Sequence, residues 1–148
     1  MIGISSILVV CVGNICRSPV GEAVLRNMLG EDWNIGSAGL GALVGHGADS
    51  TMMDIAAVRG VDLSEHTARQ ISKTLANSYD LILVMENGHR LEIMEKFPEI
   101  SGRVMLFSKW NGALDIKDPF RRERELHSRV CDEIVAAGAA WAEKLKVI

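Results

Sequence analysis

The sequence has little that would mark a secreted, membrane-spanning or nucleic-acid-binding protein. It holds three cysteines among 148 residues, two of them in one short segment, which is too few for a disulfide framework. The N-terminus has no basic region followed by an apolar core, and no apolar run approaches the roughly 20 residues of a membrane helix. A net charge of −3 gives no overall attraction to nucleic acid or anionic membranes. We therefore expect a cytoplasmic protein with no nucleic-acid partner and no stable membrane insertion.

The composition is that of an ordinary globular protein. Hydrophobic residues make up 48% of the chain and charged residues 24%. The length suits a single domain over residues 1–148 that is large enough to bury a core. We find no internal repeat, low-complexity tract or linker that would divide it.

Strand-like and helix-like patterns alternate along the chain. Short apolar runs predict strands at residues 7–10, 33–38, 81–85 and 104–107. Apolar spacing predicts a helix ending at Gly30, a helix from Asp49 to Gly60, and a helix before Pro98 that is marked by Leu91, Met94 and Phe97. The last predicted helix keeps one apolar face, formed by Leu126, Val130, Ile134, Ala137, Trp141 and Leu145. This order predicts an α/β fold, a three-layer doubly wound sheet of four parallel strands with helices on both faces.

The segment CVGNICRSP, residues 11–19, joins the first predicted strand to the first predicted helix. Its glycine and asparagine tolerate unusual backbone angles, and we expect Ser18 to cap the helix with Pro19 in the first helical position. Backbone N–H groups at such a helix start bind anions, and a thiol placed there, as Cys11 is, is favoured as the thiolate. Arg17 adds a guanidinium that can hold two phosphate oxygens. The segment therefore combines a nucleophile, a phosphate cradle and a forked cation.

This run resembles the active-site signature of the low-molecular-weight protein tyrosine phosphatases, Cys-x5-Arg-Ser/Thr near the N-terminus. The resemblance covers nearly the whole chain and includes Asp118-Pro119, Ser37-Ala38-Gly39 and Ala68-Arg69-Gln70. The stretch SAGLGALVGHGAD, residues 37–49, is most similar to the bacterial exopolysaccharide-associated (Wzb-like) type. The resemblance implies a monomeric phosphotyrosine phosphatase that needs no cofactor or metal. Its implied partner is a phosphotyrosine protein, a bacterial tyrosine autokinase of exopolysaccharide or capsule production.

The resemblance also assigns roles to individual residues. Cys11 is the nucleophile that becomes phosphocysteine, Arg17 holds the phosphate, and Asp118 is the general acid and then the base. From the residues alone, Cys11 could be a buried structural cysteine, and Asp118 could cap the final helix with Pro119 in its first position. The implied phosphate-binding loop consists of Val12, Gly13, Asn14, Ile15, Cys16, Arg17 and Ser18. The residues expected to support that loop are Asn14, Ser18, Ser37 and His66.

An apolar rim is expected where the substrate enters. Its candidate residues, each of which could also be simple packing, are Val12, Ile15, Leu40, Leu43 and Phe120. Many family members have tyrosine after the Asp-Pro pair, whereas this chain has Phe120, so regulation by phosphorylation at that position is absent.

Four groups of side chains have other expected roles. Cys16 is either a packing residue or, by resemblance, a partner that traps oxidised Cys11 as a disulfide. We expect Cys131 to lie in the core. The other histidines, His46, His89 and His127, show no metal-ligand spacing and are expected on the surface. The cluster Arg121, Arg122 and Arg124 is either a solvated helix start or a docking site for an acidic phosphopeptide.

Three other functions compete with this interpretation. A thioredoxin-coupled arsenate reductase shares the fold and loop but needs further cysteines after the third strand, and residues 83–96 contain none. A protein-arginine phosphatase carries threonine at the position of Ile15, where an apolar side chain favours a phenyl ring over a guanidinium. A noncatalytic phosphate-binding module would not need Cys11, Arg17 and Asp118 together.

Overall fold

The computed structural model describes residues 3–146. Its four strands are β1 (Ser6–Cys11), β2 (Asn34–Gly39), β3 (Leu81–Val84) and β4 (Val104–Leu106). Its α-helices are α1 (Arg17–Leu29), α2 (Ser50–Val58), α3 (Lys73–Asn77), α4 (Asn87–Lys96) and α5 (Arg124–Lys146), and a 3-10 helix, η1, spans Pro98–Arg103. Within residues 3–146, no helix is both long enough and apolar enough to cross a membrane.

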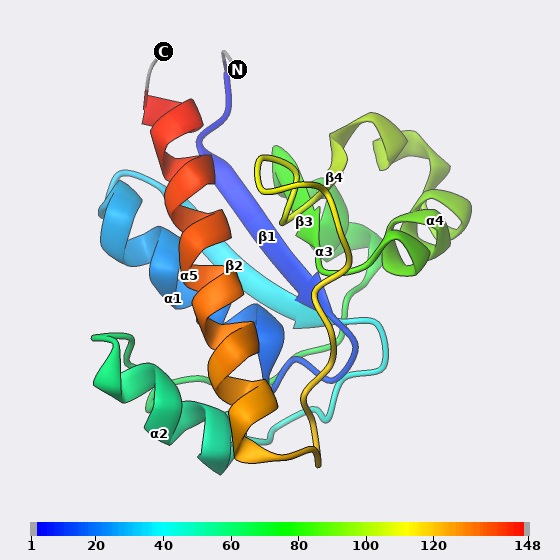
Figure 1. The fold of residues 1–148 in the computed structure, drawn as a ribbon. Helices are drawn as coiled ribbons and strands as arrows, with labels where there is room; N and C mark the ends of the chain where they lie inside the picture. The colour runs from blue at the N-terminus through cyan, green and yellow to red at the C-terminus, as the bar shows by residue number, and fades with distance from the viewer. Residues whose placement is uncertain (1–2, 147–148) are drawn as a thin grey trace.

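The strands form one parallel sheet in the order β2-β1-β3-β4. Helices α1, α2 and α5 lie on one face and α3 and α4 on the other (Figure 1). Alternate side chains of β1 enter the two layers, because Ile7 and Val9 pack into the core under α1 and α5 while Leu8 and Val10 pack into the core on the opposite face. The predicted three-layer doubly wound fold is confirmed.

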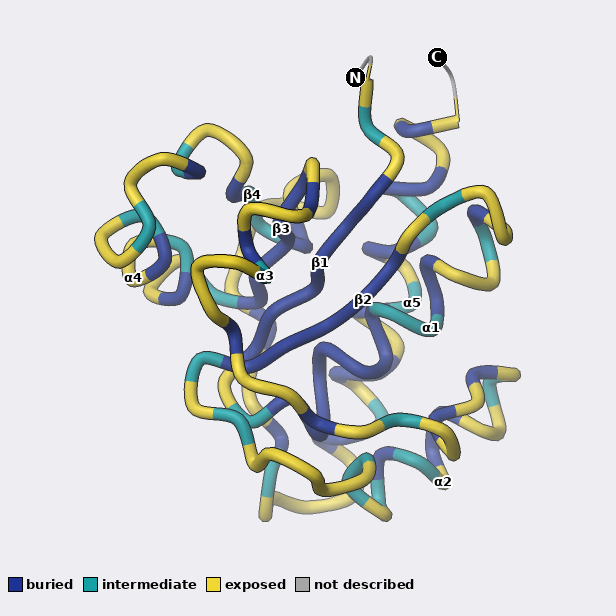
Figure 2. The backbone as a smooth tube through the Cα atoms, turned by 180° about the vertical axis from the view of Figure 1, so that it is seen from behind, coloured by how far each residue is buried: buried dark blue, intermediate teal, exposed yellow. Residues whose placement is uncertain are grey.

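Strand β1 places the functional segment. It is buried along its whole length (Figure 2). The chain continues from β1 to β2 on one side and then to β3 on the other side, so the strand order reverses beside β1. Ligands of open parallel sheets bind at such a reversal, outside the carboxyl ends of the strands. Cys11 is the last residue of β1 and therefore lies at that point.

The predicted strands lie within two residues of those observed, and the six apolar residues predicted for the last helix are all buried in α5. The predicted helix before Pro98 is found as α4, but the residues that it buries differ in part from those that marked it. Leu91 is 56% exposed, whereas His89 and Ile93 are buried against the sheet. The short elements α3 and η1 were not predicted, because neither is long enough to show a helical period.

The two predicted helix caps near the site are also wrong. Helix α1 begins at Arg17 with Cys16 at its N-cap, so Pro19 is the third residue of the helix. Ser18 does not cap it, because its hydroxyl is bonded to Cys11 and Asn14. Asp118 does not cap α5, which begins six residues later; its Oδ1 instead accepts the Phe120 N–H in a tight turn.

Candidate active site

The nucleophile candidate lies against a hydroxyl. Cys11 is 2% exposed, and its Sγ lies 3.0 Å from Ser18 Oγ. Asn14 Nδ2 donates to the same Oγ at 2.7 Å, so the Ser18 hydroxyl keeps its own hydrogen for the sulfur. A hydrogen bond from a hydroxyl stabilises a thiolate more than a thiol, so this contact favours the reactive form of Cys11.

Asn14 is the centre of the loop's support. Its φ of 56° places it in the left-handed region, which asparagine accepts more readily than most residues. Its side chain donates to Ser37 Oγ at 3.0 Å and accepts the Arg69 backbone N–H at 2.9 Å, and its carbonyl accepts from His66 Nε2 at 2.5 Å. The structure thus brings all the predicted supports together and adds Arg69, which was not predicted to support the loop.

The loop presents its amides to one side. Carbonyls along it accept hydrogen bonds from neighbouring segments; they belong to Cys11, Val12, Gly13, Asn14 and Ile15. In a planar trans peptide the carbonyl and the following N–H point in opposite directions, so the amides of residues 12–16 face the other way. Gly39 allows the neighbouring strand end to approach, since a Cβ there would lie 2.3 Å from the Val12 carbonyl. The result is a ring of free donors suited to an anion.

Arg17 is held in place by groups that the sequence did not identify. Its guanidinium is buried, and Nη1 donates to Glu86 Oε2 at 2.5 Å and to the Ile116 carbonyl at 2.7 Å. Its Nη2 lies 3.8 Å from Asp118 Oδ2. Glu86 lies two residues after the end of β3, the neighbour of β1. Its position at the carboxyl edge of the sheet is the sequence signal that could have identified it.

A cavity of about 180 Å³ lies over this loop. It is lined by Cys11, Val12, Gly13, Ile15, Cys16, Arg17, Gly41, Leu43, Asp118 and Phe120. All three predicted catalytic residues and most of the predicted rim therefore meet at one cavity. Leu40 does not line it, because its side chain packs against the core on the opposite face of the sheet.

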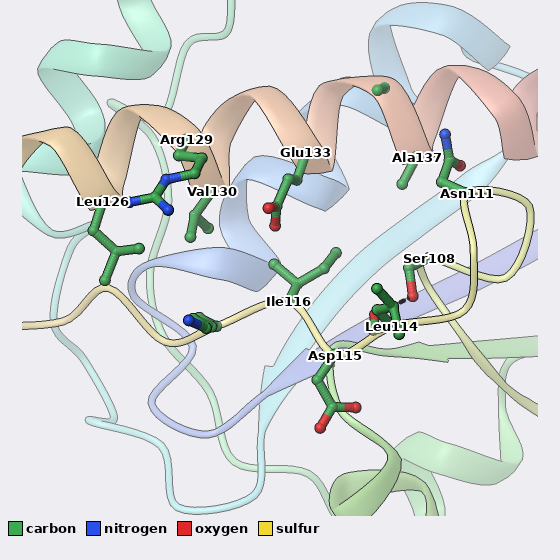
Figure 3. Close-up of a pocket in the computed structure, with 12 residues that line it drawn as sticks. Ser108, Asn111, Leu114, Asp115, Ile116, Leu126, Arg129, Val130, Glu133 and Ala137 are labelled. Carbon is green, nitrogen blue, oxygen red and sulfur yellow. Dashed lines mark hydrogen bonds between the residues drawn. The ribbon is translucent and has the colours of Figure 1, made fainter.

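A larger cavity, of about 420 Å³, lies between α5 and the segment before Asp118 (Figure 3). Leu126 and Val130 of α5 line it opposite Ile116, on the segment that leads to Asp118. It includes neither Cys11 nor Arg17, so cavity size does not locate the reactive groups in this molecule.

The remaining cysteines and histidines differ in burial. Burial, reinforced by the Asp49 carboxylate, raises the pKa of the Cys16 thiol far above its usual range. Cys131 lies in the core as predicted, and His46 is exposed. The surface prediction is wrong for His89 and His127. His89 is on the buried side of α4. His127 is 2% exposed because the first turn of α5 packs toward Asp49.

Comparison with known proteins agrees with this geometry. The family model of the low molecular weight phosphotyrosine protein phosphatases matches residues 6–147. The tyrosine phosphatase Wzb of Escherichia coli K12 is 47% identical over 141 residues, 95% of each chain. The structure of Vibrio vulnificus Wzb with benzylphosphonate has a TM-score of 0.93 at 42% identity, covering 96% of this chain and 99% of that one.

An arginine phosphatase also shares the fold. The YwlE enzyme of Geobacillus stearothermophilus has a TM-score of 0.90 at 31% identity, covering 97% of this chain and 94% of that one. The Wzb proteins have the higher identities, and the family model covers almost the whole chain. This chain belongs to the low-molecular-weight protein tyrosine phosphatase family, and is of its Wzb-like kind.

Proposed function

We propose that this protein hydrolyses protein phosphotyrosine through a phosphocysteine intermediate on Cys11. Its proposed substrate is a bacterial tyrosine autokinase of exopolysaccharide or capsule production. The observation that carries the proposal is the convergence of Cys11, Arg17 and Asp118 on one cavity above a ring of backbone donors.

The first step is transfer of the phosphoryl group to sulfur. The Cys11 thiolate attacks phosphorus, the bond from phosphorus to the tyrosine oxygen breaks, and Asp118 gives its proton to that oxygen. The Arg17 guanidinium, oriented by Glu86 and the Ile116 carbonyl, stabilises the charge on the phosphoryl oxygens together with the loop amides.

The second step is hydrolysis of phosphocysteine. Asp118, now ionised, takes a proton from a water molecule that attacks phosphorus, and the bond from phosphorus to sulfur breaks. Sulfur leaves as a thiolate, which the Ser18 hydroxyl stabilises from 3.0 Å. Inorganic phosphate is released and the free enzyme is restored.

The cavity lining favours an aromatic leaving group. Ile15, Leu43 and Phe120 line it and would bury a phenyl ring, whereas a guanidinium would lose hydration against these apolar side chains. The Wzb protein of Vibrio vulnificus in complex with benzylphosphonate, a phosphonate with an aromatic ring, supports the same substrate class. We further propose that the enzyme works in the cytoplasm as a monomer, with one catalytic domain over residues 1–148 and no cofactor.

The decisive assay compares peptides carrying phosphotyrosine, phosphoarginine or phosphoserine, with thioredoxin-coupled arsenate reduction as a further reaction. Phosphotyrosine should be hydrolysed fastest, and Cys11→Ser should remain folded but lose essentially all turnover, because a serine hydroxyl is not ionised there. Activity retained by Cys11→Ser would refute the covalent mechanism. Faster hydrolysis of phosphoarginine, or arsenate reduction, would refute the substrate class.

A further inference from the structure

A second cluster of reactive side chains lies where three helices meet beside the phosphate loop. Cys16 is at the N-cap of α1, Asp49 at the N-cap of α2, and His127 in the first turns of α5. The cysteine sulfur, a carboxylate oxygen and an imidazole nitrogen all lie within 4.8 Å of one another. We propose that these three residues bind a zinc ion, with water in the fourth position.

The spacing of the ligand atoms fits a tetrahedral zinc site. His127 Nε2 lies 3.4 Å from Asp49 Oδ2, and bond lengths of about 2.0–2.2 Å place nitrogen and oxygen ligands of tetrahedral zinc about 3.3 Å apart. A sulfur ligand would lie about 3.6 Å from each of them. The Cys16 sulfur lies within 4.8 Å of a carboxylate oxygen of Asp49 and of a ring nitrogen of His127, so a shift of about 1 Å completes the site.

The histidine is already oriented as a ligand. His127 Nδ1 lies 3.0 Å from the Glu123 carbonyl, which can only accept, so Nδ1 carries a proton and Nε2, on the side of Asp49, is the nitrogen that would bind zinc. Metal-binding histidines commonly donate their other N–H to a carbonyl in this way. Asp49 is fixed too, since its Oδ2 accepts the Met52 N–H at 3.0 Å.

The charges suit a divalent cation. Zinc binds the deprotonated cysteine, and a Cys16 thiolate and the Asp49 carboxylate together carry two negative charges. Thiolate and imidazole ligands select zinc over magnesium or calcium, which prefer oxygen. On binding, a zinc–sulfur bond replaces the sulfur–hydrogen bond, one proton leaves to solvent, and nothing is oxidised or reduced.

Zinc in this site would connect three helices to the phosphate loop. The Asp49 N–H donates to the Ile15 carbonyl at 2.8 Å, so the start of α2 already contacts that loop. The ion would add bonds to α1 and α5. It would also occupy the Cys16 thiol, which could then no longer react with Cys11. This goes beyond the phosphatase activity, because the proposed steps of phosphoryl transfer use none of the side chains of Cys16, Asp49 and His127.

The test measures metal binding directly. The purified, metal-free protein is dialysed against zinc chloride, and in parallel against cobalt chloride, whose thiolate complexes give a charge-transfer band in the near ultraviolet. We expect one ion per chain, a cobalt–thiolate band, and a higher melting temperature with zinc, because the ion binds the folded state. Absence of stoichiometric binding would overturn the proposal.

Variants separate this site from the catalytic thiol and from adventitious binding. Cys16→Ser should abolish the cobalt–thiolate band, and His127→Gln and Asp49→Asn should each weaken zinc binding at least about tenfold. Asparagine can still cap α2, so Asp49→Asn decides the matter if His127→Gln fails to fold. The controls Cys11→Ser, Cys131→Ala and His46→Gln should bind as the wild type does. Loss of the band in Cys11→Ser, or its survival in Cys16→Ser, would place the ion elsewhere and overturn the proposal. Failure of the phosphatase assay would leave these results unaffected.

Discussion

Ser18 Oγ lies 3.0 Å from Cys11 Sγ and accepts a hydrogen bond from Asn14 Nδ2 at 2.7 Å, so its own hydrogen is directed to the sulfur. In the proposed reaction Cys11 is the leaving group of the second step, and Ser18→Ala removes the donor that stabilises it. Hydrogen bonds to charged groups contribute about 1.5–3 kcal/mol, which corresponds to roughly a 10–100-fold slower hydrolysis of phosphocysteine.

That loss should be confined to the second step. Rapid-quench kinetics with an aryl phosphate should show a burst of phenol in Ser18→Ala, and mass spectrometry should show phosphocysteine accumulating. A slower first step without accumulation would mean that Ser18 acts by placing the loop rather than by stabilising the leaving thiolate.

The loss of hydrolysis rate on removing the Asp118 carboxyl should depend on the leaving group of the substrate. Asp118→Asn removes the acid but keeps the size of the side chain, so hydrolysis of phosphotyrosine, whose phenolate leaves poorly, should fall roughly 10²–10⁴-fold. An activated aryl phosphate should be affected much less, because its leaving group needs no proton. Equal losses in kcat on both substrates would show that Asp118 serves only to hold the loop that it shares with Phe120.

A feature of this site can be predicted from the sequence when residues close together in the chain determine it. The buried strand before Cys11 and the one-sided apolar pattern of α5 are local, and both are found as predicted. The start of α1 is not found as predicted, because Ser18 has a typical capping side chain that the folded loop uses for Cys11 and Asn14 instead. These contacts within the loop, over seven and four positions, replace the helix cap.

Contacts between residues that are far apart in the sequence were not predicted either. Glu86 binds Arg17 across 69 positions, and neither residue indicates the other in the sequence. His127 and Asp49 are 78 positions apart, and spacing along the chain suggested a surface histidine rather than a buried neighbour of Cys16. The family resemblance supplied roles for Cys11 and Asp118, but it gave nothing for these contacts.

Oxidation with peroxide tests whether Cys16 traps oxidised Cys11 as a disulfide. Peroxide converts a thiolate such as Cys11 to a sulfenic acid, and attack by Cys16 would give a disulfide and release water. Peroxide should therefore inactivate the enzyme and dithiothreitol should restore it, whereas Cys16→Ser should recover less and Cys131→Ala as well as the wild type. Peptide mapping of the oxidised protein checks this directly, and finding no Cys11–Cys16 crosslink would exclude the trap.

His89 should make the stability of the fold depend on pH. Burial lowers its pKa below the ordinary 6.5 and Arg17 lowers it further, while Glu86, Glu92 and Asp115 oppose the shift. As the pH falls below about 6.5, the unfolded chain takes up a proton that the folded protein resists, so the free energy of unfolding decreases. Urea unfolding at pH 7.5 and 5.5 should show a larger loss for the wild type than for His89→Gln. Equal losses in the two proteins would contradict this origin.

The last prediction concerns the two arginines beside the catalytic cavity, Arg121 and Arg122. Arg121 lies with its guanidinium 5.1 Å from the centroid of the Phe120 ring, so it stands at the mouth of the cavity. Arg122 follows it and lies 3.7 Å from Glu123, with both side chains largely exposed. A peptide with several phosphotyrosines could place one ring in the cavity and a neighbouring phosphate near these arginines. Exposed contacts of this kind are weak, about 0.2–1 kcal/mol each, and are screened by salt.

Arg121→Ala/Arg122→Ala should therefore lower kcat/KM on a multiply phosphorylated kinase-tail peptide about 2–10-fold at low salt, and less at high salt. Hydrolysis of a small aryl phosphate should be unchanged, because it reaches only the cavity. The control is Lys144→Ala/Lys146→Ala, which removes two positive charges at the opposite end of α5 and should have little effect on either substrate. If both substrates respond alike, or if the control has the same effect, the arginines act only through net charge. A tail peptide that is no better than an unrelated phosphotyrosine peptide would argue against the kinase as substrate, while leaving the roles of Cys11 and Asp118 intact.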